Sequence, residues 1–402
     1  MVTQAEKRRG PWARILAWGR VAWGGLFAGL GLLAVVPAPS GDLWKVGLGV
    51  TEWGHWVGLL ALAPLLPGWR RSRVGQVGAL LGLIGAGLAV SSLARALPVA
   101  AGVPNGLSAA FGVARPRSST GPHPLTARAT PLSLLDVLRG VPQPAVRLDT
   151  LTYATPAGEP LALDLYRPVG DRRANPCVIT IHGGSWQNGS RVDLPELNRY
   201  LAGQGYAVAA LDYRMAPRHP FPSAIDDVRA ALAYLKAHAA DLGIDPTQFV
   251  LLGRSAGAQL ALLAAYTPSD PAIRGVVSLY GPTDLAYGYD HPANPAVLDS
   301  RAVQDAYLGG TPTTAAAAYA AAAPINFVGP TTPPTLLIHG DRDDLVRAVQ
   351  SERLATRLQA TGRPYYYLRL PWANHGCDVN LSGPCGQITT YAVERFLAAV
   401  VH

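Results

Sequence analysis

Ser255 stands in the string Gly253-Arg254-Ser255-Ala256-Gly257, which has the pattern G-x-S-x-G. The apolar run Phe249 to Leu252 before it predicts a buried strand, and the run Gln259 to Tyr266 after it predicts a helix. A serine at such a strand–turn–helix junction is held in a strained backbone conformation with its hydroxyl exposed, as a catalytic nucleophile requires. The alternative is an ordinary glycine-containing turn, which the flanking strand and helix disfavour.

A serine hydroxyl becomes a nucleophile when a histidine, itself oriented by a carboxylate, removes its proton. Asp343 lies 88 residues after Ser255, in the loop that follows the predicted strand Leu336 to Ile338. His375 lies 32 residues further on, after another predicted strand. Loops at the carboxyl ends of parallel strands meet at one edge of a sheet, so we expect these three side chains to lie together.

Other residues of the same types compete for these roles. Asp341 and Asp344 share the loop with Asp343, and periodicity alone does not separate the three carboxylates. His339 precedes the acid loop and His402 ends the chain, so both are interpreted as structural or incidental.

The tetrahedral intermediate of acyl transfer needs N–H donors for its oxyanion. Ala256 offers one directly after the serine, where the helix dipole also favours negative charge. Gly184 and Ser185, which follow the apolar run ending at Ile181, are the other predicted donors. His182 is interpreted as a residue that shapes this loop.

From Val146 onward, short apolar runs alternate with helical stretches, which predicts a mostly parallel sheet covered by helices on both faces. Residues 146–402 make one α/β domain of 257 residues, preceded by a linker over residues 106–145. The stretch 284–328, with its alanine run, is a candidate lid over the site.

Several motifs in this domain resemble those of the α/β-hydrolase carboxylesterases, both the hormone-sensitive-lipase-like group and the bacterial acetyl-xylan and feruloyl esterase-like branch. They are His182-Gly183-Gly184, Asp212 to Pro217, Phe221-Pro222, Gly253-x-Ser255-x-Gly257, His339-Gly340-x-x-Asp343 and His375-Gly376. The resemblance implies an α/β-hydrolase fold, a triad of Ser255, Asp343 and His375, and hydrolysis of carboxylic esters without a cofactor. Trp186 stands where many lipase-like relatives carry another glycine, as in kynurenine-formamidase-like enzymes, so amide and formamide substrates stay open.

The first 105 residues differ in character from the rest of the chain. They hold ten Lys and Arg against three Asp and Glu, together with seven of the nine tryptophans. Three apolar stretches, at about residues 15–36, 46–66 and 74–97, approach or exceed the length that crosses a bilayer. A cleaved signal peptide would account for the first stretch alone. The sequence therefore predicts a membrane region of three transmembrane helices.

The distribution of positive charge predicts how this region is oriented. Arg and Lys precede the first stretch and lie between the second and third, whereas the loop at 37–42 has none. The positive-inside rule then places the N-terminus in the cytoplasm and the catalytic domain outside it, in a multi-pass protein of a bacterial cell membrane. Basic residues beside apolar spans are topology signals, so binding of nucleic acid is not expected.

Three smaller features concern packing and stability. Gly25/Gly29, Gly54/Gly58 and Gly78/Gly82 have the G-x-x-x-G spacing of close helix contacts. Glu52 and His55 would share a face of the second span, most simply as a satisfied interhelical contact. Cys377 and Cys385 are a candidate disulfide in an oxidising compartment, and no cysteine–histidine cluster indicates a metal site.

Taken together, these patterns predict a membrane-anchored serine carboxylesterase that acts on a small-molecule or lipid ester and needs no cofactor or metal. The sequence does not determine the oligomeric state, and a homo-oligomer is among the alternatives. The alternatives are a formamidase or amidase on the same fold and a non-catalytic binding protein. Every part of the predicted site is present, which disfavours the binding protein. A transporter is disfavoured because the apolar spans carry a single ionisable pair and no inverted repeat.

Overall fold

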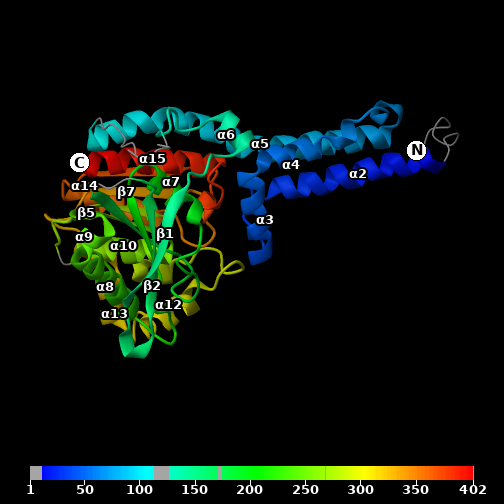
Figure 1. The fold of residues 1–402 in the computed structure, drawn as a ribbon. Helices are drawn as coiled ribbons and strands as arrows, with labels where there is room; N and C mark the ends of the chain where they lie inside the picture. The colour runs from blue at the N-terminus through cyan, green and yellow to red at the C-terminus, as the bar shows by residue number, and fades with distance from the viewer. Residues whose placement is uncertain (1–10, 113–125, 171–173, 268, 402) are drawn as a thin grey trace.

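The chain forms a mixed eight-stranded sheet flanked by helices, with a narrow helical arm that projects from it (Figure 1). This computed structural model describes residues 11–112, 126–170, 174–267 and 269–401. The basic residues at 7–9, part of the expected linker and His402 lie outside these ranges.

The strand order is β1-β2-β4-β3-β5-β6-β7-β8, with β1, β2 and β4 joined in antiparallel fashion and all pairs from β4 to β8 parallel. The strands are β1 (Val146–Ala154), β2 (Leu161–Pro168), β3 (Asn175–Ile181), β4 (Ala207–Leu211), β5 (Ile244–Arg254), β6 (Ile273–Leu279), β7 (Thr335–Gly340) and β8 (Tyr365–Leu370). The central strands are continuous apolar runs because both of their faces are buried. The predicted sheet is thus observed, with β1 as an additional edge strand.

Helices cover both faces of the sheet, and each turns an apolar side toward it. One face packs against α8 (Ser223–Ala237), α10 (Ala256–Tyr266) and α14 (Val349–Ala360), and the other against α7 (Pro195–Gly203), α15 (Pro384–Val400) and the end of α5 (Arg73–Phe111). The remaining helices are α2 (Pro11–Leu32), α3 (Gly41–Glu52), α4 (Gly54–Ala61), α6 (Leu134–Arg139), α9 (Ala239–Leu242), α11 (Leu285–Asp290), α12 (Ser300–Leu308) and α13 (Ala316–Ala322). Single 3₁₀ turns are η1 (Ala63–Leu65), η2 (Trp69–Arg71), η3 (Pro156–Gly158), η4 (Pro324–Phe327) and η5 (Cys377–Val379).

Helices α2, α4 and the first half of α5 lie side by side and form the arm (Figure 1). A Cβ on Gly24 would lie 2.4 Å from Gly78 O, and one on Gly31 would lie 2.9 Å from Gly85 O, so α2 and α5 run parallel in close contact. Gly25 has nothing within 4 Å of such a Cβ. The prediction that the Gly25/Gly29 pair forms the packing face of the first helix was therefore wrong.

The second apolar stretch is not one continuous helix. It divides at Trp53, whose φ of −115° and ψ of 24° end α3 and begin α4. Glu52 and Gly54 have different partners: Cys385 N donates to Glu52 Oε2 at 3.3 Å, whereas a Cβ on Gly54 would lie 2.1 Å from Ala89 O. Only α2 and α5 among the described helices are long and apolar enough to cross a membrane. The predicted single helix over 46–66, with Glu52 and His55 on one of its faces, is therefore wrong.

Helix α5 links the arm without interruption to the domain that contains the sheet (Figure 1). It runs to Phe111, past the boundary expected at residue 105 and through two prolines. Residues spaced along one side of its second half, Ala96, Ala100, Val103 and Leu107, are buried in the same core as α15. This end of α5 therefore packs in the core beside the sheet.

Candidate active site

Ser255 lies on the sharp turn between β5 and α10. Its φ of 53° and ψ of −121° are strained for a residue with a side chain. The turn depends on glycine, because a Cβ on Gly253 would lie 2.1 Å from Gly257 O and one on Gly257 would lie 2.2 Å from Ile181 O. The backbone N–H of Ser255 donates to Leu279 O at 2.9 Å, which ties the turn to β6. This is the geometry that the G-x-S-x-G string predicts.

His375 and Asp343 form a buried pair at the ends of β8 and β7. Nδ1 of His375 lies 2.7 Å from Oδ2 of Asp343, and Oδ1 of the carboxylate accepts hydrogen bonds from Leu345 N and Val346 N, both at 2.8 Å. His375 and Asp343 are 6% and 8% exposed. The carboxylate is therefore held rigidly toward the ring, so the imidazole keeps its free nitrogen on the opposite side.

The two competing aspartates have other partners. Asp341 pairs with Arg369 at 3.1 Å, near the surface. Asp344 accepts a hydrogen bond from Asn374 Nδ2 at 3.0 Å. Asp343 is thus the member of the loop that contacts His375.

Asp343 also contacts a second histidine. Nε2 of His339 lies 3.2 Å from Asp343 Oδ2 and 2.9 Å from Val346 O, while its Nδ1 lies 2.7 Å from Ser351 Oγ. Burial alone would raise the pKa of Asp343, but the charge of His375 and hydrogen bonds from both histidines outweigh it and hold the pKa well below the usual range. The carboxylate therefore stays ionised at neutral pH.

Ser255 and His375 line one cavity, together with the loop that follows β3. Strand β3 is paired in register with β5, Ile181 opposite Gly253, so this loop begins at the level of the serine turn. No hydrogen bond joins Ser255 Oγ to His375 in the part of the chain that the structure describes. Catalytic hydrogen bonds often tighten only when substrate binds.

The loop after β3 has an unusual backbone. Gly184, Ser185 and Trp186 have φ values of 111°, 57° and 55°. A Cβ on Gly184 would lie 2.0 Å from Asn188 O, so the first position requires glycine. Among the described residues, the N–H groups of Gly184 and Ser185 donate no hydrogen bond. Ala256 is the first residue of α10, and the first N–H groups of a helix have no acceptor within that helix. Gly184 and Ser185 line the cavity of His375, whereas Ser185 and Ala256 line a second cavity that Ser255 also borders.

Two aromatic stacking contacts hold this loop against the rest of the domain. Trp186 stacks on Tyr307 with ring centres 4.1 Å apart, and its Nε1 donates to Gln259 at 3.0 Å. His182 stacks on Tyr213 at 4.3 Å, and burial lowers its pKa, so it is neutral at physiological pH. His182 therefore shapes the loop, as its sequence position suggested.

A buried polar network that local sequence patterns did not indicate lies beside the triad residues. Arg254, the neighbour of Ser255, contacts Asp378 at 2.6 Å, and both side chains are under 10% exposed. The hydroxyl of Tyr280 donates to the same carboxylate, and its ring lies 4.5 Å from that of His375. The partners are 124 and 98 residues apart. The network connects the serine turn to the loop that carries His375.

That loop is closed by a disulfide between Cys377 and Cys385, with the Cα atoms 5.7 Å apart. Cys177 is a buried free thiol. The candidate pair is thus bonded in the structure.

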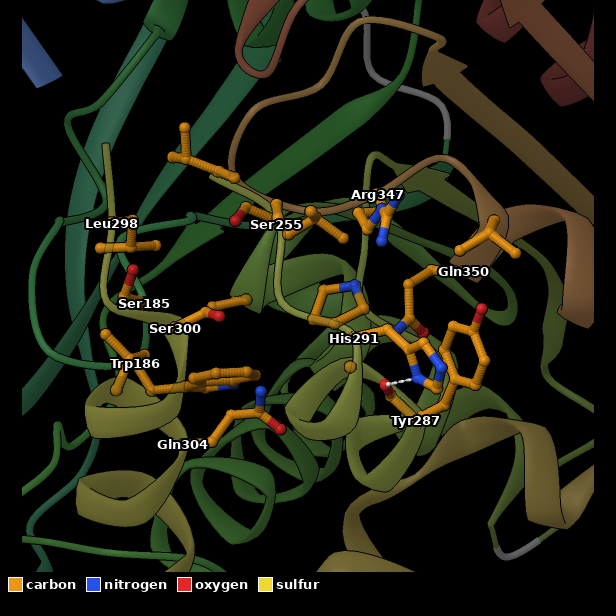
Figure 2. A pocket seen from close by; sticks show the side chains of 18 residues that line it. Ser185, Trp186, Ser255, Tyr287, His291, Leu298, Ser300, Gln304, Arg347 and Gln350 are labelled. Atoms are coloured by element: carbon orange, nitrogen blue, oxygen red, sulfur yellow. Dashed lines mark hydrogen bonds between the residues drawn. The ribbon is translucent and has the colours of Figure 1, made fainter. Parts of the chain in front are cut away.

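The stretch 284–328 covers a second, smaller cavity on the other side of Ser255. Tyr287, His291 and Gln304 from this stretch surround the same hollow as Ser185 and Ser255 (Figure 2). Residues of α11 and α12 line this cavity, and α13 belongs to the same stretch of chain. Among the described residues, no group of three or more His, Cys, Asp or Glu could hold a metal ion.

Comparisons with known proteins agree with this architecture. The BD-FAE family model matches residues 163–358, a stretch that includes Ser255 and Asp343 and ends before His375. The chain is 34% identical over 241 residues to the probable carboxylic ester hydrolase LipM of Mycobacterium tuberculosis, which covers 56% of this chain and 54% of that protein. Esterase LipC of the same organism is 34% identical over 242 residues, or 56% of this chain and 58% of that one. The chain spans little more than half the length of these curated relatives.

Solved structures show the same arrangement of strands and helices. A hyperthermophilic esterase from the archaeon Pyrobaculum calidifontis has a TM-score of 0.57 at 24% identity, over 64% of this chain and 88% of that one. A bacterial heroin esterase has a TM-score of 0.58 at 23% identity, over 67% of this chain and 89% of that one. With the strand order, these likenesses show that the chain has the α/β-hydrolase fold.

Proposed function

We propose that this protein is a membrane-anchored serine carboxylesterase with Ser255, His375 and Asp343 as its triad. The observation that carries the proposal is the buried His375–Asp343 pair, which shares a cavity with a serine on a strained, glycine-dependent turn. The esterase names of the relatives agree with this chemistry.

In the proposed reaction, His375 takes the proton of Ser255 while the serine oxygen attacks the carbonyl carbon of the ester. The oxyanion is stabilised by the N–H groups of Gly184, Ser185 and Ala256. The carbonyl carbon then loses the alcohol, which leaves with the proton from His375, and an acyl group stays on Ser255. Water then loses a proton to His375 and bonds to the acyl carbon, the bond from that carbon to Ser255 Oγ breaks, and His375 returns the proton to Oγ as the acid is released. Asp343 holds the ring and stabilises its charged form throughout.

The two cavities suggest different places for the two parts of the ester. His375 must reach the leaving oxygen to protonate it, and it lines one cavity but is not among the residues that line the cavity covered by α11 and α12. The alcohol part therefore belongs on the His375 side and the acyl part under the covering helices. In the acyl-side cavity, the space open to the centres of water molecules is about 60 Å³. A cavity of this size has room for a short acyl chain.

The arm would anchor the enzyme in the membrane. Helices α2 and α5 have the length and apolar character of membrane spans, and they run in the same direction. The chain between them must therefore return through the bilayer, which α4 and η1 would do as a short third crossing. An odd number of crossings puts the N-terminus and the catalytic domain on opposite sides, and Arg70 and Arg71 mark the cytoplasmic side.

Hydrolysis of p-nitrophenyl esters from acetate to palmitate by the detergent-solubilised full chain tests the proposal. We expect activity with an optimum at short acyl chains, and Ser255→Ala should lower kcat on the order of 10⁶-fold. Faster serine-dependent turnover of an aryl formamide would assign the site to the formamidase class instead. Ester turnover that survives in Ser255→Ala would refute the proposed nucleophile.

A further inference from the structure

Helix α3, which lies between the arm and the body, forms part of the cavity that contains His375. Trp44 from α3 lines this cavity together with Leu194 and Leu345. Leu48, one turn further along, lies 3.8 Å from the position that a Cβ on Gly376 would occupy, beside His375. A segment outside the matched α/β-hydrolase region therefore supplies part of the wall.

The C-terminal end of α3 is fixed to the catalytic domain. Nδ2 of Asn380 donates to Glu52 O at 3.1 Å, and Cys385 N donates to Glu52 Oε2 at 3.3 Å, at the start of α15. Glu52 is fully buried there.

The chain that enters α3 is fixed as well. Asn294 Nδ2 donates to Ala38 O at 2.7 Å, and Ala38 N donates to Asp344 Oδ2 at 3.5 Å. Hydrogen bonds on both sides of α3 therefore fix the helix that carries Trp44 to the domain that contains the sheet.

In the proposed topology, α3 also lies at the level of the outer surface of the bilayer. It runs across the axes of α2 and α4 at the point where the arm meets the body (Figure 1). Leu43 and Val46 on α3 are each 40% exposed, although both are large apolar residues. In the proposed topology α3 crosses the outer ends of the span α2 and the short crossing α4, so its exposed apolar side chains would lie in the interface of the bilayer. The cavity behind α3 is therefore beside the membrane surface.

The size of the cavity indicates what it accepts. The space open to the centres of water molecules is about 490 Å³ in this cavity and about 60 Å³ in the acyl-side cavity. The larger space lies on the side of His375, where the leaving alcohol must be protonated. The two cavities thus fit a small acyl group on a large alcohol.

We propose that α3, through Trp44, is a specificity-determining wall for the alcohol part of the substrate, and that the substrates are short-acyl esters of long apolar alcohols held at the membrane surface. This inference rests on the proposed esterase function. In the acylation step the Ser255 Oγ–acyl bond forms, the bond from the acyl carbon to the alcohol oxygen breaks, and the proton from His375 goes to that oxygen.

A series of alkyl acetates tests the inference, because the acyl group stays constant while the alcohol lengthens from ethyl to octyl. The full chain in lipid vesicles is assayed by acetate release, and the ratio of kcat/KM for octyl acetate to that for ethyl acetate is measured. Within one preparation this ratio does not depend on the fraction of folded enzyme. We expect Trp44→Ala to lower the ratio about tenfold, because apolar contact with the longer alcohol is lost. Trp44→Phe should restore most of it.

Trp56→Ala is the matched control, since Trp56 is an exposed tryptophan of α4 that does not line the cavity. It should leave the ratio unchanged. An unchanged ratio in Trp44→Ala, or an equal fall in Trp56→Ala, would overturn the assignment of α3 while the esterase function stands. Absence of turnover of every acetate by the unmodified protein would instead remove the proposed function, and this inference with it.

Discussion

Asp343 contacts two histidine rings, and the surroundings of the two rings differ. His375 faces the cavity of Ser255, whereas His339 is fully buried and also bonded to Val346 O and Ser351 Oγ. With its hydrogen on Nε2, His339 donates to the carboxylate of Asp343, and its Nδ1 accepts a hydrogen bond from the hydroxyl of Ser351. His339 is therefore a positioning residue for Asp343.

The first residue-scale prediction concerns this carboxylate. Asp343→Asn keeps the shape of the side chain but removes its charge and changes the proton arrangement at His375 Nδ1. We expect kcat on a p-nitrophenyl ester to fall roughly 10⁴-fold with little change in KM. Asp341→Asn, at a partly exposed pair with Arg369, should keep kcat near that of the unmodified protein. Equal losses in both variants would contradict the assignment.

The buried pair of Arg254 and Asp378 predicts a loss of stability. Asp378→Asn leaves the guanidinium of Arg254 without its charged partner in a buried site. The free energy of unfolding should fall by about 3–5 kcal/mol, as followed by chemical denaturation. Asp226→Asn breaks an exposed pair with Arg229 and should change it by less than about 0.5 kcal/mol. Similar values for the two variants would show that the buried network contributes little.

At the scale of elements, the site depends on how closely α10 approaches β3. Gly257→Ala would place a Cβ 2.2 Å from Ile181 O, a backbone atom that cannot move aside easily. We expect this overpacking to cost at least about 3 kcal/mol of stability and to abolish ester hydrolysis.

Gly329→Ala is the control for this change, because the nearest atom to its new Cβ is 4.0 Å away. Thermal melting and ester hydrolysis should both match those of the unmodified protein. A folded, active Gly257→Ala protein would contradict the account of the turn.

The sequence predicted the elements that carry the site because their signals are local. Apolar runs located strands β2 to β8, and the glycine spacing placed the serine turn. Strand β1 was not predicted, since Arg147, Asp149 and Thr150 interrupt its apolar residues at the sheet edge. The division of α3 from α4 was missed because its cause is distant: Glu52 contacts α15, more than 300 residues away.

The network of Arg254, Asp378 and Tyr280 was missed for the same reason. The serine, histidine and aspartate follow a known chain order, whereas this ion pair joins residues 124 apart with no motif of its own. Choosing Asp343 among three aspartates needed family resemblance, because each of the three follows the same strand. Only the fold distinguishes them by their partners.

For the whole molecule, the arm and the catalytic domain form one structure. Helix α5 begins in the arm and ends in the core beside α15, where Phe111 contacts Phe396 with ring centres 4.9 Å apart. Helix α3 meets the active-site cavity. If the arm anchors the protein as proposed, the continuation of α5 into the core would fix the height of the active site above the bilayer.

The proposed topology predicts which surfaces a membrane-impermeant maleimide can reach in intact cells. Val192→Cys, on an exposed loop of the catalytic domain, should be labelled. Arg71→Cys, in the loop before α5, should be labelled only after the membrane is broken. The native cysteines are bonded or buried and give little background. Labelling of both positions in intact cells would contradict an odd number of crossings.

The most direct test of the central claim is to identify the residue that a fluorophosphonate modifies. The full chain in detergent is treated with the reagent, digested, and analysed by mass spectrometry, beside Ser255→Ala and His375→Gln. The account predicts one phosphonylated serine, Ser255, with no adduct in Ser255→Ala and a strongly slowed reaction in His375→Gln. An adduct on another residue, or ester hydrolysis that continues with Ser255 unmodified, would contradict it.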